Sequence, residues 1–180
     1  MHETYPALFA PITWPDGPIH VQFEIGAPPS EHLISNVNAV PCTRAGQWIV
    51  IQLADGSWEI PGGTVEENEA PYDALVREVL EEAGARVQSA QYLGALKMHS
   101  LAEQPFRPHL PHPISYRAVY LCQVELVGPP QIPESGGEQV VAVQPLSLAE
   151  AVARFEQIER FDLADLYRYA AGQHSTGTMV

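Results

Sequence analysis

The segment spanning residues 62–85 constrains the fold of this chain more than any other feature. Its apolar residues recur at helical spacing from about residue 69 to residue 83, which predicts one amphipathic helix. Asn68 is the expected N-cap of that helix, and Gly84 stands where a left-handed C-cap is wanted. Pro71 falls in the first turn, where the helix needs no backbone donor. We call residues 62–85 the box segment.

The predicted helix has two chemically different faces. The apolar face is formed by Tyr72, Leu75, Val76, Val79, Leu80 and Ala83. Glu78, Glu81 and Glu82 gather on another face, because they are related by i, i+3 and i+4. At roughly 5 Å and an effective dielectric of about 20, each carboxylate pair costs about 3 kcal/mol. A hard divalent cation such as Mg²⁺ would offset that repulsion, whereas the alternative is an ordinary solvated acidic face.

The box segment resembles the Nudix box, the signature of Nudix hydrolases, which reads G-x5-E-x7-R-E-U-x-E-E-x-G-U with U aliphatic. The matching residues are Gly63, Glu69, Arg77, Glu78, Glu81, Glu82 and Gly84, with Ala85 in the last aliphatic place. The resemblance implies a Nudix-type α/β/α sandwich with a mixed β-sheet. It also implies a Mg²⁺- or Mn²⁺-dependent hydrolase that cleaves a diphosphate linkage in a nucleoside diphosphate derivative.

The resemblance assigns roles to individual residues. The implied metal ligands are the carbonyl of Gly62 and the carboxylates of Glu78, Glu81 and Glu82. Arg77 corresponds to the arginine that orients the glutamates, and Glu69 to its ionic partner. A metal-activated water would attack one phosphorus atom, with Glu78 or a carboxylate outside the box segment as general base.

Outside the box segment, several residues are candidates for the same site. Glu138 precedes the last expected strand, where many Nudix hydrolases place a catalytic or metal-binding acid, although a plain surface role explains it equally well. Arg44, Arg107 and Arg117 are candidate phosphate contacts, and for each of them a solvated surface position is the favoured alternative. Gln52 stands where many family members carry a phosphate-binding arginine, which weakens any transfer of nucleoside triphosphate specificity.

A proline-rich loop spans residues 104–113 and carries Phe106, His109 and His112. Stiff loops of this kind often cover substrate, so we expect this one near the site. The two histidines could suggest zinc, but neither a cysteine nor an acidic third ligand stands nearby. The zinc interpretation is therefore the weaker one.

The remaining pattern predicts alternating strands and helices around the box segment. Expected strands cover residues 19–25, 33–40, 48–53, 58–60, 86–96, 114–126 and 140–143. Ser147 and Glu150 form a capping box that opens a helix with Phe155, Ile158 and Phe161 on its buried face. A second short helix is expected over residues 163–171, and residues 1–18 are expected to be an irregular arm.

Composition narrows the class of protein. We expect residues 1–180 to form a single domain, with residues 1–32 an N-terminal arm and strand extension. The net charge of −13 and pI near 4.8 argue against binding a nucleic-acid polymer. Cys42 and Cys122 stand far apart, and no apolar run reaches transmembrane length, so a cytoplasmic protein without a membrane partner is expected. A homodimer is compatible with the sequence.

Two functions from different classes remain open at this point. The first is hydrolysis of a small nucleotide-type diphosphate. The second is a catalytically silent Nudix-fold module that binds or senses a nucleotide. The intact Glu78-x-x-Glu81-Glu82 pattern favours the hydrolase, because a binding module has no reason to retain that electrostatic cost.

Overall fold

The computed structural model describes residues 2–14, 18–132 and 139–176. Its helices are α1 (Pro6–Phe9), the 3₁₀ helix η1 (Glu31–Leu33), α2 (Pro71–Ala83), α3 (Leu148–Glu156) and α4 (Phe161–Thr176). Its strands are β1 (Ile12–Trp14), β2 (Ile19–Glu24), β3 (Ile34–Thr43), β4 (Trp48–Leu53), β5 (Trp58–Glu59), β6 (Gly62–Thr64), β7 (Ala85–Ser100), β8 (Ile114–Leu126) and β9 (Val140–Leu146). Every expected strand and both expected C-terminal helices are present, with boundaries that differ by a few residues.

The strands of the described residues form one mixed sheet. Its order is β1-β2-β7-β8-β3-β4-β5, with β6 paired to β3 and β9 paired to β4. The β3–β8 pair is parallel, whereas the neighbouring pairs are antiparallel. The short strand β6 lies along the first half of β3, where Asn36 pairs with Thr64 and Asn38 with Gly62. This pairing fixes the start of the box segment against the centre of the sheet.

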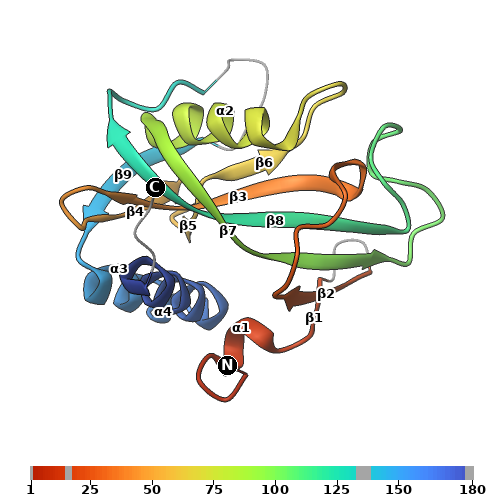
Figure 1. Cartoon of the computed structure of the whole chain (residues 1–180), viewed down its shortest axis with the longest axis horizontal. Helices are drawn as coiled ribbons and strands as arrows, with labels where there is room; N and C mark the ends of the chain where they lie inside the picture. Colours follow the sequence, from red (N-terminus) through yellow and green to blue (C-terminus); the bar gives the residue numbers. More distant parts are fainter. Residues whose placement is uncertain (1, 15–17, 133–138, 177–180) are drawn as a thin grey trace.

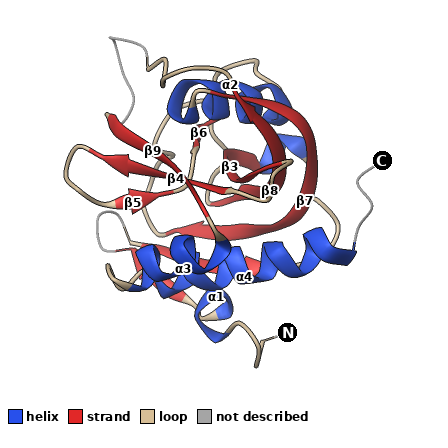
Figure 2. Ribbon diagram, turned by 90° about the vertical axis from the view of Figure 1, so that its left-hand side faces the viewer, coloured by secondary structure: helices blue, strands red, loops and turns tan. Residues whose placement is uncertain are grey.

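Helices cover both faces of the sheet. Helix α2 lies on one face, and α3 and α4 lie on the other, with α1 beside them (Figures 1 and 2). The core under α2 includes Leu75 and Val79, while the core under α3 and α4 includes Phe155 and Tyr167. The Tyr167 hydroxyl donates a hydrogen bond to the carbonyl of Ile49 on β4. The layering is that of the α/β/α sandwich implied by the resemblance.

The two ends of α2 differ in how well the sequence predicted them. Gly84 forms the expected left-handed C-cap, with φ of 57° and its N–H donating to the carbonyl of Leu80. The expected N-cap was wrong: Ala70 holds that position without a side-chain hydrogen bond, and Asn68 adopts a left-handed φ of 65° in the preceding loop. Asparagine tolerates this conformation, so the loop uses Asn68 to turn. Tyr72, expected on the apolar face, is 50% exposed.

The Gly84 cap leads to a prediction about stability. A Cβ added at Gly84 would lie 2.1 Å from the carbonyl oxygen of Gly128, a backbone atom that has little freedom to move. Gly46 has a similar left-handed φ of 78° but open space around it. Gly84→Ala should therefore lower the free energy of unfolding by at least about 3 kcal/mol, against about 1 kcal/mol for Gly46→Ala. Urea denaturation measures both, and equal losses would contradict the packing argument.

Parts of the N-terminal arm form regular secondary structure, α1 and β1, whereas an irregular arm was expected for residues 1–18. Leu8 and Phe9 of α1 are buried, and the N–H of Ala7 donates to a carboxylate oxygen of Asp165 on α4 at 2.9 Å. Strand β1 then adds to the edge of the sheet beside β2, with Trp14 opposite Ile19. The contact of α1 with α4 was not predictable, because Ala7 and Asp165 lie 158 residues apart along the chain.

The C-terminal helices confirm one local signal and correct another. The capping box is formed, since the Ser147 and Glu150 side chains each bind the backbone N–H of the other residue. Phe155 is fully buried, whereas Phe161, expected to be buried with it, is 52% exposed at the start of α4. Helix α4 is also longer than the expected range of 163–171. None of the helices in the described part of the chain has both the length and the apolar character needed to cross a membrane.

Candidate active site

A large pocket lies against the box segment. Its volume is about 1510 Å³, and four parts of the chain line it. The box segment forms one wall, and strands of the sheet form the floor. The N-terminal arm and the α3–α4 junction, which includes Arg160, form the opposite side. The pocket therefore joins an acidic end at the box segment to an end formed by distant parts of the chain.

The acidic end is built by direct contact between α2 and the loop before it. Glu78 and Glu82 are only 8% and 9% exposed, and Glu81 is half-buried beside them. The N–H of Gly62 donates to a carboxylate oxygen of Glu82 at 2.9 Å. Gly63 lies so close to Glu78 that an added Cβ would meet its Oε1 at 2.1 Å. The two glycines thus let the loop approach the glutamates.

Arg77 organises these carboxylates. Its guanidinium binds both oxygens of Glu69, at 2.8 and 2.9 Å, which confirms the expected ion pair between these two residues. Its Nη1 also contacts Glu78 at 2.7 Å and Glu81 at 3.3 Å, and its Nη2 donates to the carbonyl of Thr64. One guanidinium therefore ties the loop, β6 and the acidic face of α2 together.

Burial and hydrogen bonding give the carboxyls of Glu78 and Glu69 different pKa values. Desolvation raises the pKa of Glu78 above its ordinary value, although the nearby Arg77 guanidinium opposes that shift. The hydrogen bond from Arg77 instead lowers the pKa of Glu69, which is more exposed to solvent. A buried carboxylate with a raised pKa is a better proton acceptor than an exposed one. Burial and hydrogen bonding thus move the pKa values of Glu78 and Glu69 in opposite directions.

Residues 32–168 match the family model of the NUDIX domain, which is more than half of the chain. The chain belongs to the NUDIX domain family. A solved structure, a NUDIX hydrolase from Nitrosomonas europaea, superposes with a TM-score of 0.52 at 20% identity and covers 77% of this chain and 90% of that chain. This likeness, together with the layering of the sheet, confirms the predicted fold.

Two curated relatives resemble parts of this Nudix chain more closely. A putative 8-oxo-dGTP diphosphatase from Bacillus subtilis is 46% identical over 59 residues, which cover 33% of this chain and 37% of the relative. An RNA pyrophosphohydrolase from Shewanella sediminis is 38% identical over 66 residues, which cover 36% and 38% of the two chains. The similarity thus spans well under half of the length of either relative.

The Nudix box offers a donor set that fits a hard divalent cation. Glu78, Glu81, Glu82 and the Gly62 carbonyl supply oxygen atoms, which Mg²⁺ and Mn²⁺ prefer. Among the described residues, however, no three His, Cys, Asp or Glu side chains converge closely enough to hold a metal. The Arg77 guanidinium already contacts Glu78 and Glu81. Arg77 therefore compensates only part of the negative charge of the acidic face in this structure.

The candidate arginines outside the Nudix box lie in different places. Arg107 and Arg117 both line the pocket. Arg44 lies in the exposed turn after β3, six residues beyond Asn38, and does not line it. At about 3.3 Å per residue, six residues of strand separate Arg44 from the Nudix box by roughly 20 Å. Glu138 lies outside the described residues.

Gln52 does not reach the pocket. Its side-chain amide donates to the carbonyl of Gly56 in the β4–β5 turn, and it is absent from the pocket lining. Trp14 and Arg160 line the pocket but were not predicted as site residues. A sequence scan offers no signal for either, because they come to line the pocket only through tertiary packing of the arm and of α4.

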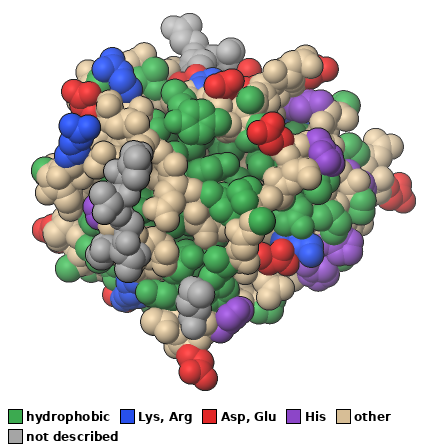
Figure 3. Space-filling view, in the orientation of Figure 1, with side chains coloured by type: hydrophobic (Ala, Val, Ile, Leu, Met, Phe, Trp, Pro, Cys, Tyr) green, Lys and Arg blue, Asp and Glu red, His purple; other side chains and the backbone are tan. Residues whose placement is uncertain are grey.

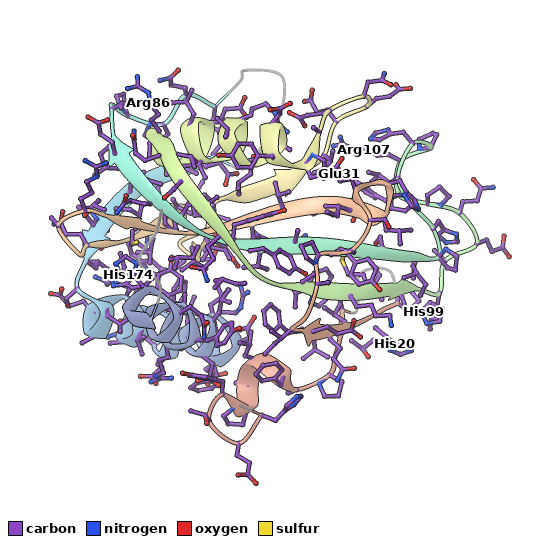
Figure 4. All side chains as sticks on the ribbon, in the orientation of Figure 1. His20, Glu31, Arg86, His99, Arg107 and His174 are labelled. Atoms are coloured by element: carbon purple, nitrogen blue, oxygen red, sulfur yellow. The ribbon has the colours of Figure 1, made fainter. Side chains whose placement is uncertain are left out.

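The proline-rich loop lies close to the Nudix box, as expected. His109 makes a hydrogen bond with the carbonyl of Val65 at 3.2 Å, and Arg107 lies over the 87% exposed ring of Phe106. Figure 4 shows Arg107 at the end of the molecule where this loop approaches the loop before α2. His112 contacts the carbonyl of Ala102 instead, so the two histidines bind different backbone groups.

Proposed function

We propose that this chain is a Mg²⁺- or Mn²⁺-dependent hydrolase that cleaves a diphosphate linkage in a nucleoside diphosphate derivative. The observation that carries the proposal is the contact between the buried carboxylates of Glu78 and Glu82 and the glycine loop at the pocket wall. Burying two carboxylates side by side costs free energy, and the cost is understandable where a cation is bound. The names of the two relatives, a diphosphatase and a pyrophosphohydrolase, support the bond type.

The residues of the acidic end would have different roles in the reaction. Glu78, Glu81, Glu82 and the Gly62 carbonyl would hold the divalent cation, which when bound neutralises phosphate charge and acidifies water. Glu78 would accept the proton of the attacking water at a carboxylate oxygen. Arg77 would position Glu78 and Glu81 through the ion pairs described above, with Glu69 fixing the guanidinium. Glu138 stays a proposed additional acid.

The charge of the chain supports a small substrate over a nucleic-acid polymer. The net charge is −13, and on the face shown in Figure 3 the Lys and Arg side chains are scattered rather than gathered in a stripe. Polymer binding needs a continuous basic surface. Because one relative is an RNA pyrophosphohydrolase, an RNA with a 5′-triphosphate end belongs among the substrates tested. Cys42 and Cys122 are free and buried, which supports a cytoplasmic location.

The function is tested by a phosphate-release screen with Mg²⁺ or Mn²⁺ over nucleotides, nucleotide sugars, dinucleotides, coenzyme A and a 5′-triphosphate RNA. We expect Glu82→Gln to reduce release on the best substrate at least about 100-fold, because glutamine can still accept the Gly62 hydrogen bond but lacks the ligand charge. Circular dichroism should show an unchanged fold.

Glu125→Gln is the matched control, since Glu125 is exposed on β8 and does not line the pocket. It should release phosphate at the wild-type rate. Wild-type turnover in Glu82→Gln would contradict the assignment of Glu82 as a metal ligand. If the wild type hydrolyses no diphosphate but binds nucleotides, the alternative function, a catalytically silent Nudix-fold binding or sensor module, is correct.

A further inference from the structure

The proline-rich loop, which connects β7 to β8, is closed at its base by two hydrogen bonds. The N–H of Ser100 donates to the carbonyl of Pro113 at 2.9 Å. The ring of His112 makes a second bond with the carbonyl of Ala102, also at 2.9 Å. Four of the ten residues from 104 to 113 are prolines, and each of them has a fixed φ. The loop therefore has little conformational freedom to lose when a ligand binds.

The proline-rich loop is also bonded to the box segment, through His109. A carbonyl oxygen only accepts hydrogen bonds, so His109 Nε2 is the donor to the carbonyl of Val65, at 3.2 Å. Val65 directly follows β6 and is buried, and its own N–H donates to the carbonyl of Ser35 at 2.9 Å. The loop is thus bonded to the stretch of backbone that also places Gly62 and Gly63 against the glutamates.

Arg107 lies two residues before His109 and lines the pocket together with Phe106 (Figure 4). The N–H of Leu110 donates to the carbonyl of Arg107 at 3.0 Å, which closes a turn that contains His109. The guanidinium carbon of Arg107 is 5.8 Å from the centroid of the Phe106 ring, a cation–π contact. The ring has no oxygen or nitrogen acceptor, so the N–H donors of the guanidinium stay available to phosphate oxygens.

The described residues that line the pocket are predominantly acidic, with eight Asp and Glu residues against four arginines. Carboxylates already bind the guanidinium groups of Arg77 and Arg160. Arg117 contacts the ring of Trp14. In the part of the chain that the structure describes, no ion pair joins Arg107 to a carboxylate. A phosphate that enters the pocket is therefore repelled by much of the lining but attracted by Arg107.

We propose that Arg107 binds a phosphate group of the substrate beside the metal-bound one, and that His109 is a positioning residue that holds Arg107 there. The proposal rests on the proposed function, which places the scissile diphosphate at the box segment. A guanidinium binds two phosphate oxygens at once, in a fork geometry that lysine lacks. The His109–Val65 hydrogen bond keeps the phosphate contact in a fixed relation to the acidic end. Arg107 therefore recognises the phosphate chain and not the base attached to it.

The test measures binding of two diphosphate analogues that cannot be hydrolysed to the full chain. One is methylenediphosphonate, which has no base, and the other is the ADP analogue with the same methylene bridge. Isothermal titration calorimetry with Mg²⁺ should show that Arg107→Ala weakens both at least about tenfold, because a charge-assisted bidentate contact is lost. Arg107→Lys should recover only part of the affinity, since it keeps the charge without the fork.

His109→Ala should weaken both analogues about threefold, because the loop loses its bond to Val65. His109→Gln, whose amide N–H can still donate to that carbonyl, should restore most of the affinity. A positioning role also predicts that the losses are not additive, so His109→Ala should cause little further loss in an Arg107→Ala background. An equal loss from His109→Ala in both backgrounds would refute the positioning role.

Arg44→Ala is the matched control, because it removes an exposed arginine that does not line the pocket. It should bind both analogues with wild-type affinity. Wild-type affinity in Arg107→Ala would overturn the phosphate contact, as would a loss confined to the ADP analogue or a wild type that binds neither analogue.

Hydrolysis tests the proposed function separately from this contact. A wild type that cleaves diphosphates, with normal analogue binding in Arg107→Ala, refutes the phosphate contact alone. A wild type that binds the analogues through Arg107 but cleaves no diphosphate refutes the proposed hydrolase alone.

Discussion

Glu78→Gln is expected to lose hydrolysis and to gain stability at the same time. Removing the proposed general base should lower kcat at least about 100-fold. In metal-free buffer at pH 7, the variant should nevertheless unfold at a higher temperature than the wild type. The reason is that desolvation dominates the environment of Glu78 and raises its pKa, so the ionised carboxylate opposes folding even beside Arg77.

The sign of this effect is checked by varying pH. A carboxyl with a raised folded-state pKa costs no stability below its unfolded pKa of about 4.3, and its cost grows as pH rises towards the folded-state value. The stability difference between Glu78→Gln and wild type should therefore shrink as pH falls towards about 4. Differential scanning calorimetry of both proteins in EDTA measures it.

Added metal should reverse the order of stability. If the proposed site is correct, Mg²⁺ should raise the Tm of the wild type, whereas Glu78→Gln should respond much less. Glu125→Gln is the control here as well, because its exposed carboxylate should change neither the EDTA nor the Mg²⁺ result. A Glu78→Gln protein that is less stable than wild type in EDTA would show that the Arg77 ion pair outweighs desolvation.

The second large effect is a difference between alanine substitutions at two adjacent glycines, Gly63 and Gly62. In Gly63→Ala the new Cβ would meet the end of the Glu78 side chain, at 2.1 Å from Oε1, and that flexible end can move aside. We expect a stability loss of about 1 kcal/mol or less but a fall in kcat of about 100-fold, since a shift of about 1 Å in a catalytic group has that effect.

In Gly62→Ala, by contrast, the loss of stability should be the larger effect. Its Cβ would meet the carbonyl oxygen of Val37 at 2.2 Å and the Cα of Asn38 at 2.8 Å, both backbone atoms of the central strand β3. Overpacking of this kind should cost about 1–3 kcal/mol or more of unfolding free energy. Urea unfolding and phosphate release on both variants distinguish the two. Equal stability losses would contradict the proposed difference between side-chain and backbone neighbours.

Local signals in the sequence predicted the parts of the fold that depend on nearby residues. Gly84 and the Ser147–Glu150 capping box could be read directly, because a helix end is decided within a few residues of itself. Asn68 failed as an N-cap, because the loop before α2 needs a left-handed residue there and Glu69 is engaged by Arg77. Asparagine favours the N-cap position, but it also tolerates a positive φ in a loop. The sequence alone does not show which of these two roles Asn68 takes.

Features that depend on distant contacts were not predictable. The hydrogen bond between Ala7 of the arm and Asp165 on α4 joins residues 158 positions apart. Arg117 and Arg44 look alike as isolated basic residues, yet the order of the strands brings only Arg117 into the pocket. The Arg77–Glu69 pair was predictable, because both residues lie inside one recognised motif. The acidic end of the site was thus accessible from the sequence, and the opposite end was not.

The docking of the arm on α4 has a consequence for how such a protein can change. Arg77 and the glutamates draw their contacts from residues 62–82, while the part of the pocket that the N-terminal arm lines depends on Ala7, Phe9 and their partners. Substitutions confined to residues 5–14 would therefore change the part of the pocket that the arm lines and leave the contacts within residues 62–82 intact. In evolutionary terms, replacing this short N-terminal segment could change the ligands that the pocket accepts in one step.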